Sequence, residues 1–123
     1  LMCRYIYPHM KKKKDGFILN ISSGAGKNGI PNMAGYCASK FAVAGFSEAL
    51  ALEAKPNDVR VSVLYPGSIN TGFHEKIGAE PPNQKKQAMM QPEDIAGTVY
   101  HTVIQPRRYW VFEIVMRAFY MGR

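Results

Sequence analysis

Residues 59–64 (VRVSVL) decide the fold class of this chain. They form a short, almost continuously apolar run of mainly β-branched residues, which predicts a buried strand. A turn signal lies just before them at residues 56–58 (PND), and it follows an alanine-rich stretch, residues 33–54, that predicts a long helix. Pro66 and Gly67 then end the strand. The centre of the chain therefore predicts a helix that leads through a tight turn into a strand of the core.

The alternation of helix and strand continues on both sides of this segment. Residues 1–14 predict the end of a helix with lysines in its last turn, and residues 17–21 (FILNI) predict a short buried strand. Downstream, the sequence from Pro92 predicts a third helix, and residues 109–116 predict a third strand. Strands that alternate with helices are joined in parallel by crossover connections. We therefore predict an α/β layer fold with a parallel sheet.

Length and composition limit the classes of protein that fit. With 123 residues the chain forms at most one domain, and its 46% of hydrophobic residues are enough for an ordinary globular core. Cys3 and Cys37 are the only cysteines, and His74 and His101 have no partners at metal-ligand spacing. We therefore expect neither a disulfide framework nor a metal site. No run of about 18 apolar residues predicts a membrane span, so we expect a soluble, cytoplasmic protein with no membrane partner.

The net charge is positive and unevenly distributed. It amounts to +7, from 16 Lys and Arg residues against 9 Asp and Glu residues, and four of the bases are consecutive at residues 11–14 (KKKK). Such a run fits either a solvated helix end or a site for a polyanion such as nucleic acid. Aromatic residues are not interleaved with the lysines, and no RNA-binding or DNA-binding module is recognisable. We favour the solvated helix end and expect no nucleic-acid partner.

Residues 24–29 (GAGKNG) fit the G-x-G-x-x-G pattern of dinucleotide-binding turns and follow a predicted strand. In that pattern a helix begins within the glycines, so that its N-terminus meets the pyrophosphate. Here residues 30–32 (IPN) intervene and hold the chain extended. We therefore favour a flexible turn that carries Ser22 and Ser23 over a phosphate-binding site.

Tyr36 and Lys40 lie four residues apart in the predicted long helix, which places them on one face and within reach of each other. A lysine ammonium beside a phenol stabilises the phenolate, and this suits the tyrosine for general acid/base chemistry. Taken alone, the spacing also fits an ordinary surface pair, because tyrosine and lysine are often four residues apart by chance.

Three motifs, taken in order, favour the chemical interpretation. Residues 20–23 (NISS) end the first predicted strand, residues 36–43 (YCASKFAV) lie on the long helix, and residues 65–71 (YPGSINT) follow the next strand. Together, at this spacing, they strongly resemble the short-chain dehydrogenase/reductase family, and the resemblance runs from about residue 1 to about residue 116. It implies a Rossmann-type doubly wound parallel sheet, of which this chain is the C-terminal half only.

The resemblance implies a role for each matching residue. Ser23 matches the serine that hydrogen-bonds the substrate carbonyl or hydroxyl, Tyr36 the general acid/base, and Lys40 the lysine that activates this tyrosine and binds the nicotinamide ribose. Residues 68–91 match the substrate loop that closes over bound cofactor. Its apolar residues either wall the substrate pocket or only anchor the loop: Phe73, Ile77, Met89 and Met90. The residues implied for cofactor binding are Tyr36, Lys40, Pro66, Gly67, Ile69 and Thr71.

The resemblance also implies an activity. It is that of an oxidoreductase that transfers hydride between NAD or NADP and a carbonyl or secondary alcohol of a small molecule, usually as a homo-oligomer. Members of the family carry the glycine-rich turn for the pyrophosphate in a first half that this sequence does not match. We therefore expect residues 1–123 to be the C-terminal catalytic half of a single NAD(P)-binding domain, a fragment of a longer enzyme. The alternative is a non-catalytic truncated remnant that acts as a dimerisation or interaction module.

Overall fold

The centre of the molecule is a three-stranded parallel sheet. The structure is a computed structural model that describes residues 2–78 and 81–120, so residues 1, 79–80 and 121–123 of the predicted domain and substrate loop lie outside the described residues. The predicted α/β fold with a parallel sheet is confirmed. In spatial order the strands are β1 (Gly16–Ile21), β2 (Val59–Pro66) and β3 (Glu113–Met116).

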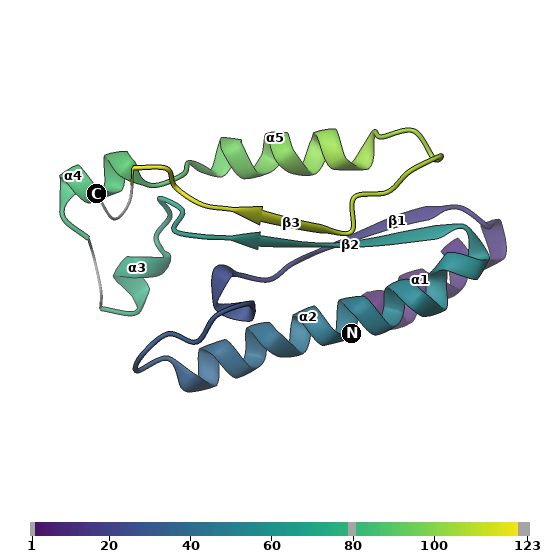
Figure 1. Cartoon of the computed structure of the whole chain (residues 1–123), viewed down its shortest axis with the longest axis horizontal. Coiled ribbons are helices and arrows are strands. Elements are labelled where there is room, and N and C mark those ends of the chain that lie inside the picture. The colour runs from purple at the N-terminus through teal and green to yellow at the C-terminus, as the bar shows by residue number, and fades with distance from the viewer. Residues whose placement is uncertain (1, 79–80, 121–123) are drawn as a thin grey trace.

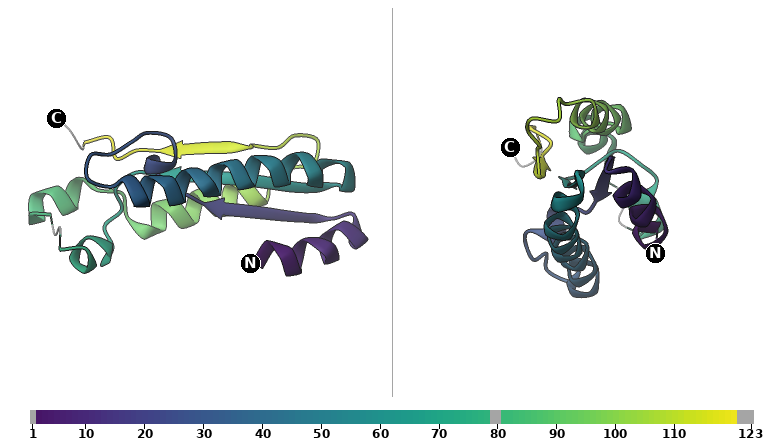
Figure 2. Two further views of the ribbon diagram at one scale, coloured as in Figure 1. Left: turned by 90° about the horizontal axis from the view of Figure 1, so that it is seen from below. Right: turned by 90° about the vertical axis from the view of Figure 1, so that its right-hand side faces the viewer.

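Helices cover both faces of the sheet, so the sheet is doubly wound (Figures 1 and 2). α1 (Met2–Lys13) and α2 (Ala34–Ala54) lie on one face, and α5 (Pro92–Val103) lies on the other. None of the described helices is long and apolar enough to cross a membrane. The other described helices are short: η1 (Gly24–Gly26), η2 (Lys55–Asn57), α3 (Phe73–Lys76) and α4 (Asn83–Ala88).

β2 forms the middle of the core and is buried at every position except one. Its side chains point alternately to the two faces of the sheet. Val59 and Val61 pack with Leu50 of α2, whereas Leu64 packs with Ile95 of α5. Burying one such aliphatic side chain contributes about 1.5–3 kcal/mol. Burial on both faces is the physical reason for the almost continuously apolar sequence of this strand.

The third strand starts later than the sequence predicts, at Glu113 rather than four residues earlier. The chain before it already runs beside β2, but side chains make part of the contact. The indole N–H of Trp110 donates to the Val61 carbonyl (2.9 Å), and the Ser62 hydroxyl donates to the Val111 carbonyl (2.6 Å). Because these bonds stand in place of the regular backbone ladder, the strand begins only where backbone pairing does.

The stretch at residues 68–91 contains α3 and α4, although its sequence shows little helical periodicity. α4 (NQKKQA) consists largely of Gln, Lys and Ala, which favour helix by propensity even without an apolar stripe. The two ends of the stretch meet, because Ile69 and Met90 form an isolated parallel bridge. The Asn70 N–H also donates to the Met90 carbonyl (2.8 Å). The predicted substrate loop is therefore closed at its base.

All three strands run in the same direction, so their carboxyl ends lie at one edge of the sheet, on the left of Figure 1. η1 follows β1 at this edge, α3 and α4 follow β2, and α2 begins at the same end of the molecule. Ligands of open α/β sheets bind outside the carboxyl ends of the strands. The fold thus brings the three sequence motifs to the edge where such sheets bind ligands.

Candidate active site

The turn after β1 carries two adjacent serines with different surroundings. Ser22 is buried; its N–H donates to the Leu64 carbonyl (2.8 Å) and its hydroxyl donates to the Lys40 carbonyl (2.9 Å), so it ties the turn to β2 and α2. Ser23 is half-buried, and its Oγ accepts a hydrogen bond from the Ala25 N–H (3.2 Å). A serine hydroxyl that accepts a bond keeps its own proton. Ser23 can therefore still donate to a ligand.

The turn lies very close to α2, and Gly26 makes this approach possible. A Cβ at residue 26 would lie 2.5 Å from the Ser22 Oγ and 2.8 Å from the Lys40 carbonyl oxygen. A glycine is needed here because the backbone of the turn meets the backbone of the helix. The next α-helix begins only at Ala34. The glycine-rich run therefore has the form of a turn rather than that of a phosphate-binding helix start.

Tyr36 and Lys40 lie one turn apart near the start of α2, and both are half-buried. The Lys40 Nζ lies 5.7 Å from the centre of the Tyr36 ring. The same ring packs against Phe73 of α3, with 5.9 Å between the two ring centres. The phenol of Tyr36 therefore lies beside a cation and an aromatic wall, which is an arrangement suited to proton transfer by a tyrosine.

The segment after β2 supplies the opposite part of the site. Pro66 is buried at the end of β2, and the Gly67 N–H donates to the carbonyl of the last residue of β3 (2.8 Å). Thr71 is exposed, and its Oγ1 accepts a hydrogen bond from the Phe73 N–H (3.4 Å). As at Ser23, the hydroxyl keeps a proton that it can donate.

These segments surround one cleft of about 170 Å³ at the carboxyl edge of the sheet. It brings together the predicted serine and tyrosine with four further residues predicted to bind the cofactor, Pro66, Gly67, Ile69 and Thr71. Lys40 stands next to the cleft, beside the Tyr36 ring. The residues that line the cleft are Ile21, Ser22, Ser23, Tyr36, Pro66, Gly67, Ser68, Ile69, Thr71, Phe73 and His74.

Phe73 and His74 line the cleft, although His74 was not predicted as a site residue and Phe73 only as one alternative for an apolar wall. Their rings are in edge contact, with 5.7 Å between the ring centres. The signal that locates them is their place two and three residues after Thr71, in the segment that crosses the cleft. In residues 2–78 and 81–120 no group of three or more His, Cys, Asp or Glu side chains could hold a metal ion.

The other apolar residues considered for the pocket wall lie elsewhere. Met89 and Met90 are buried, and Met90 packs in the core cluster of Leu64. Ile77 is exposed. Within the part of the chain that the structure describes, the two methionines therefore anchor the stretch at residues 68–91, and Phe73 contributes to the wall.

Known proteins resemble this chain in sequence. The family model for short chain dehydrogenase matches residues 1–82. The chain is 53% identical over 72 residues to a 3-ketodihydrosphingosine reductase from Bacteroides thetaiotaomicron, an alignment that covers 58% of this chain and 27% of that protein. It is also 38% identical over 104 residues to a 3-oxoacyl-[acyl-carrier-protein] reductase from Synechocystis, which covers 83% of this chain and 42% of that protein.

Solved structures resemble it in fold. An alcohol dehydrogenase from Thermococcus sibiricus, complexed with 5-hydroxy-NADP, matches with a TM-score of 0.82 at 26% identity, over 98% of this chain and 49% of that one. The chain thus spans less than half the length of each of these three relatives. The family model covers well over half of the chain, in the segment that holds all three motifs. The chain therefore belongs to the short-chain dehydrogenase family.

Proposed function

We propose that this chain carries the proton-transfer site of an NAD(P)-dependent oxidoreductase that acts on a carbonyl or secondary alcohol of a small molecule. The observation that carries the proposal is the single cleft lined by Ser23 and Tyr36, with Lys40 beside the tyrosine ring. The relatives support it, because they are named as reductases and dehydrogenases.

The side chains divide the chemistry among them. In the direction of reduction, the Ser23 hydroxyl donates a hydrogen bond to the substrate oxygen, and the Tyr36 hydroxyl gives that oxygen its proton. In oxidation, Tyr36 accepts the proton of the alcohol. The Lys40 ammonium lies 5.7 Å from the centre of the Tyr36 ring and places a positive charge beside the residue that transfers the proton. The ring of Phe73 packs beside the phenol ring, with 5.9 Å between the two ring centres.

The residues present fit a nicotinamide nucleotide. The ammonium of Lys40 and the hydroxyls of Tyr36 and Thr71 are suited to bond ribose hydroxyls and a carboxamide, and the segment from Pro66 to Ile69 offers a wall at the same cleft. When bound, the cofactor supplies or accepts the hydride. We propose NAD or NADP; solved structures similar to this chain hold NADP+ or 5-hydroxy-NADP.

We assign residues 1–123 to the C-terminal catalytic half of a Rossmann-type domain and residues 68–91 to its substrate loop. The lengths support the assignment to half of a domain, because the chain spans 42% and 49% of two of the relatives that it resembles over most of its own length. The loop assignment is supported by the closed base of the stretch and by the contact of Phe73 with Tyr36. The cytoplasm is the location we propose, because Cys3 and Cys37 carry free thiols.

The proposal is tested by measuring turnover of a longer protein, in which an N-terminal half-domain precedes residue 1. We expect oxidation of NADH or NADPH with one of a panel of ketones and aldehydes. Tyr36→Phe removes the acid/base hydroxyl and should lower kcat by at least about 100-fold. Tyr100→Phe is the matched control, because Tyr100 is 61% exposed on α5, and it should leave kcat unchanged.

Two outcomes contradict the proposal. If Tyr36→Phe turns over like the unchanged protein, the proton-transfer role is wrong. If neither protein oxidises the cofactor with any substrate of the panel, the interaction module becomes the better interpretation of this chain.

A further inference from the structure

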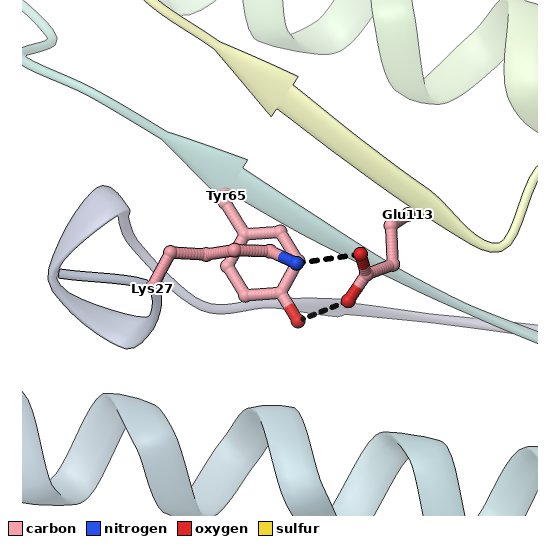
Figure 3. Close-up of polar contacts among 3 residues, drawn as sticks. All are labelled: Lys27, Tyr65 and Glu113. Carbon is pink, nitrogen blue, oxygen red and sulfur yellow. Dashed lines mark hydrogen bonds and ion pairs between the residues drawn. The ribbon is translucent and has the colours of Figure 1, made fainter.

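Three side chains from three distant segments meet on the α2 side of the sheet, near the carboxyl end of β2 and the start of β3 (Figure 3). The Lys27 Nζ forms an ion pair with Glu113 Oε2 at 2.5 Å, and the Tyr65 hydroxyl donates to Glu113 Oε1 at 3.0 Å. The same Lys27 Nζ lies 4.6 Å from the centre of the Tyr65 ring. Glu113 therefore uses both carboxylate oxygens, one toward the turn after β1 and one toward β2. We call these three residues the Glu113 clamp.

Burial and charge show that the clamp is a connected network. Tyr65 is 1% exposed, so its hydroxyl depends on Glu113 for a hydrogen bond. The hydrogen bond from Lys27 holds the pKa of Glu113 below its usual range, against the opposing effect of burial and with help from Tyr65. Burial is the largest cause that raises the pKa of Tyr65, to about 12, and the hydrogen bond to Glu113 and the charges of Glu113 and of Glu48 on α2 add to it. At neutral pH the clamp thus joins a cation, an anion and a neutral phenol.

Stability alone is a weak explanation for the ion pair. The side chains of Lys27 and Glu113 are 35% and 39% exposed, and pairs of that exposure contribute only about 0–1 kcal/mol. What distinguishes this pair is its span, because 86 residues separate its members in the chain. The clamp links the turn after β1 to β3 as well, whereas Ser22 ties the turn to β2 through the Leu64 carbonyl and to α2 through the Lys40 carbonyl.

Lys27 and Tyr65, the two residues that Glu113 binds, both adjoin segments of the proposed site. Lys27 follows η1 directly, and backbone hydrogen bonds hold the turn that it ends: the Gly26 N–H donates to the Ser23 carbonyl (2.8 Å), and the Lys27 N–H donates to the Gly24 carbonyl (3.1 Å). Ser23 begins this turn. Tyr65 immediately precedes Pro66 and Gly67, which line the cleft.

We propose that Glu113 is a positioning residue of this site: through Lys27 and Tyr65 it holds the turn that carries Ser23 against the strand end that carries Pro66 and Gly67. The proposal rests on the function proposed above for the cleft. Glu113 is not among the residues that line the cleft, and it acts through the two residues that it binds. The carboxylate is positioned for this by the sheet, because it lies on the same face of the sheet as Tyr65, diagonally across the β2–β3 ladder.

Amide hydrogen exchange tests the clamp without requiring enzyme turnover. In Glu113→Gln and in Lys27→Met, the amides of residues 26–28 should exchange about ten-fold faster, because the turn is released. Lys27→Arg keeps the charge and should restore protection. The variant that combines Glu113→Gln with Lys27→Met should show no further increase in the exchange rate, because either change alone opens the same network. Lys27 is at the surface, so Lys27→Met tests the clamp even if Glu113→Gln does not fold.

Asp15→Asn is the matched control. Asp15 pairs with Arg107 just before β1, at the opposite end of the sheet, and both side chains are exposed. This variant should leave exchange at residues 26–28 unchanged. If Glu113→Gln and Lys27→Met leave that exchange unchanged while the fold is intact, or if Asp15→Asn raises it equally, the clamp has no positioning role.

Kinetics of the version with a first half-domain give the second readout. Glu113→Gln and Lys27→Met should lower kcat about ten-fold with little change in the KM for the cofactor, and Lys27→Arg should recover kcat. Absence of turnover in the unchanged protein would count against the proposed function, and exchange would still decide on the clamp. Normal kcat in both variants despite faster exchange would overturn the positioning role alone.

Discussion

Two tyrosines show how surroundings, at the scale of single residues, decide what a phenol does in this protein. Tyr36 is half-buried at a cleft beside Lys40, where we propose that it exchanges a proton with a ligand. Tyr65 is buried and donates a hydrogen bond to Glu113. Burial, and to a smaller extent that hydrogen bond, raises the pKa of Tyr65 to about 12. The same side chain is thus suited to proton transfer in one place and to a fixed hydrogen bond in the other.

The raised pKa of Tyr65 predicts a loss of stability in alkali. The folded protein holds this proton up to about pH 12, whereas the unfolded chain releases it near 10.0, so the contribution is complete below pH 10 and is lost as the pH rises through 12. Tyr65→Phe removes the hydrogen bond and should lower the free energy of unfolding at pH 8 by about 1 kcal/mol. Between pH 10 and 12 the difference between the two proteins should shrink. Urea unfolding at several pH values measures it, and parallel pH profiles would contradict the assignment.

Three residues at or beside the cleft could be singled out from the sequence because each stands in a local motif. Ser23, Tyr36 and Lys40 each stand in a short pattern with its own spacing, and the structure brings Ser23 and Tyr36 to one cleft, with Lys40 beside it. Glu113 could not be found in this way. Its partner Lys27 is 86 residues away, and only the pairing of β2 with β3 brings the two together.

At the scale of elements, the turn between β1 and α2 depends on one close approach. Gly26→Ala would place a methyl group 2.8 Å from the Lys40 carbonyl oxygen, and neither backbone can move away without loosening the turn. The free energy of unfolding should fall by about 1–3 kcal/mol. Gly29→Ala is the matched control in the same run, because nothing lies within 4 Å of a Cβ there. Urea unfolding measures the free energy of unfolding of both variants. Equal values would show that the close approach of Gly26 to the Lys40 carbonyl is unimportant for stability.

The elements with strong periodicity or β-branched content could be predicted, and the others could not. β2 follows from its almost continuously apolar sequence, because it is covered on both faces. The start of β3 could not be predicted, since Trp110 and Ser62 use side-chain bonds where a ladder would otherwise form. α4 lacks an apolar stripe and forms from residues of high helix propensity, a weak signal in a short segment.

At the scale of the whole molecule, α2 is the longest of the described helices and carries large apolar side chains at its exposed surface. Phe46 and Leu52 on α2 are 50% and 71% exposed. We predict self-association through this surface, as the resemblance implied, because burying such side chains removes apolar area from water. Light scattering at high concentration should show a dimer or larger species, and Phe46→Glu should reduce it to a monomer. Ile77→Glu, on a side chain of similar exposure, should not. A strict monomer for the unchanged protein would contradict the prediction.

The central claim is that the cleft transfers a proton while a nicotinamide cofactor transfers a hydride. The most direct test supplies NADH or NADPH deuterated at the transferring position of the nicotinamide ring to the version with a first half-domain, together with a ketone. The hydride adds to the carbonyl carbon and the proton of Tyr36 adds to the oxygen, so the alcohol should carry the deuterium on carbon. This product should fall to background in Tyr36→Phe. An alcohol without deuterium, or the same labelled yield from Tyr36→Phe, would contradict the account.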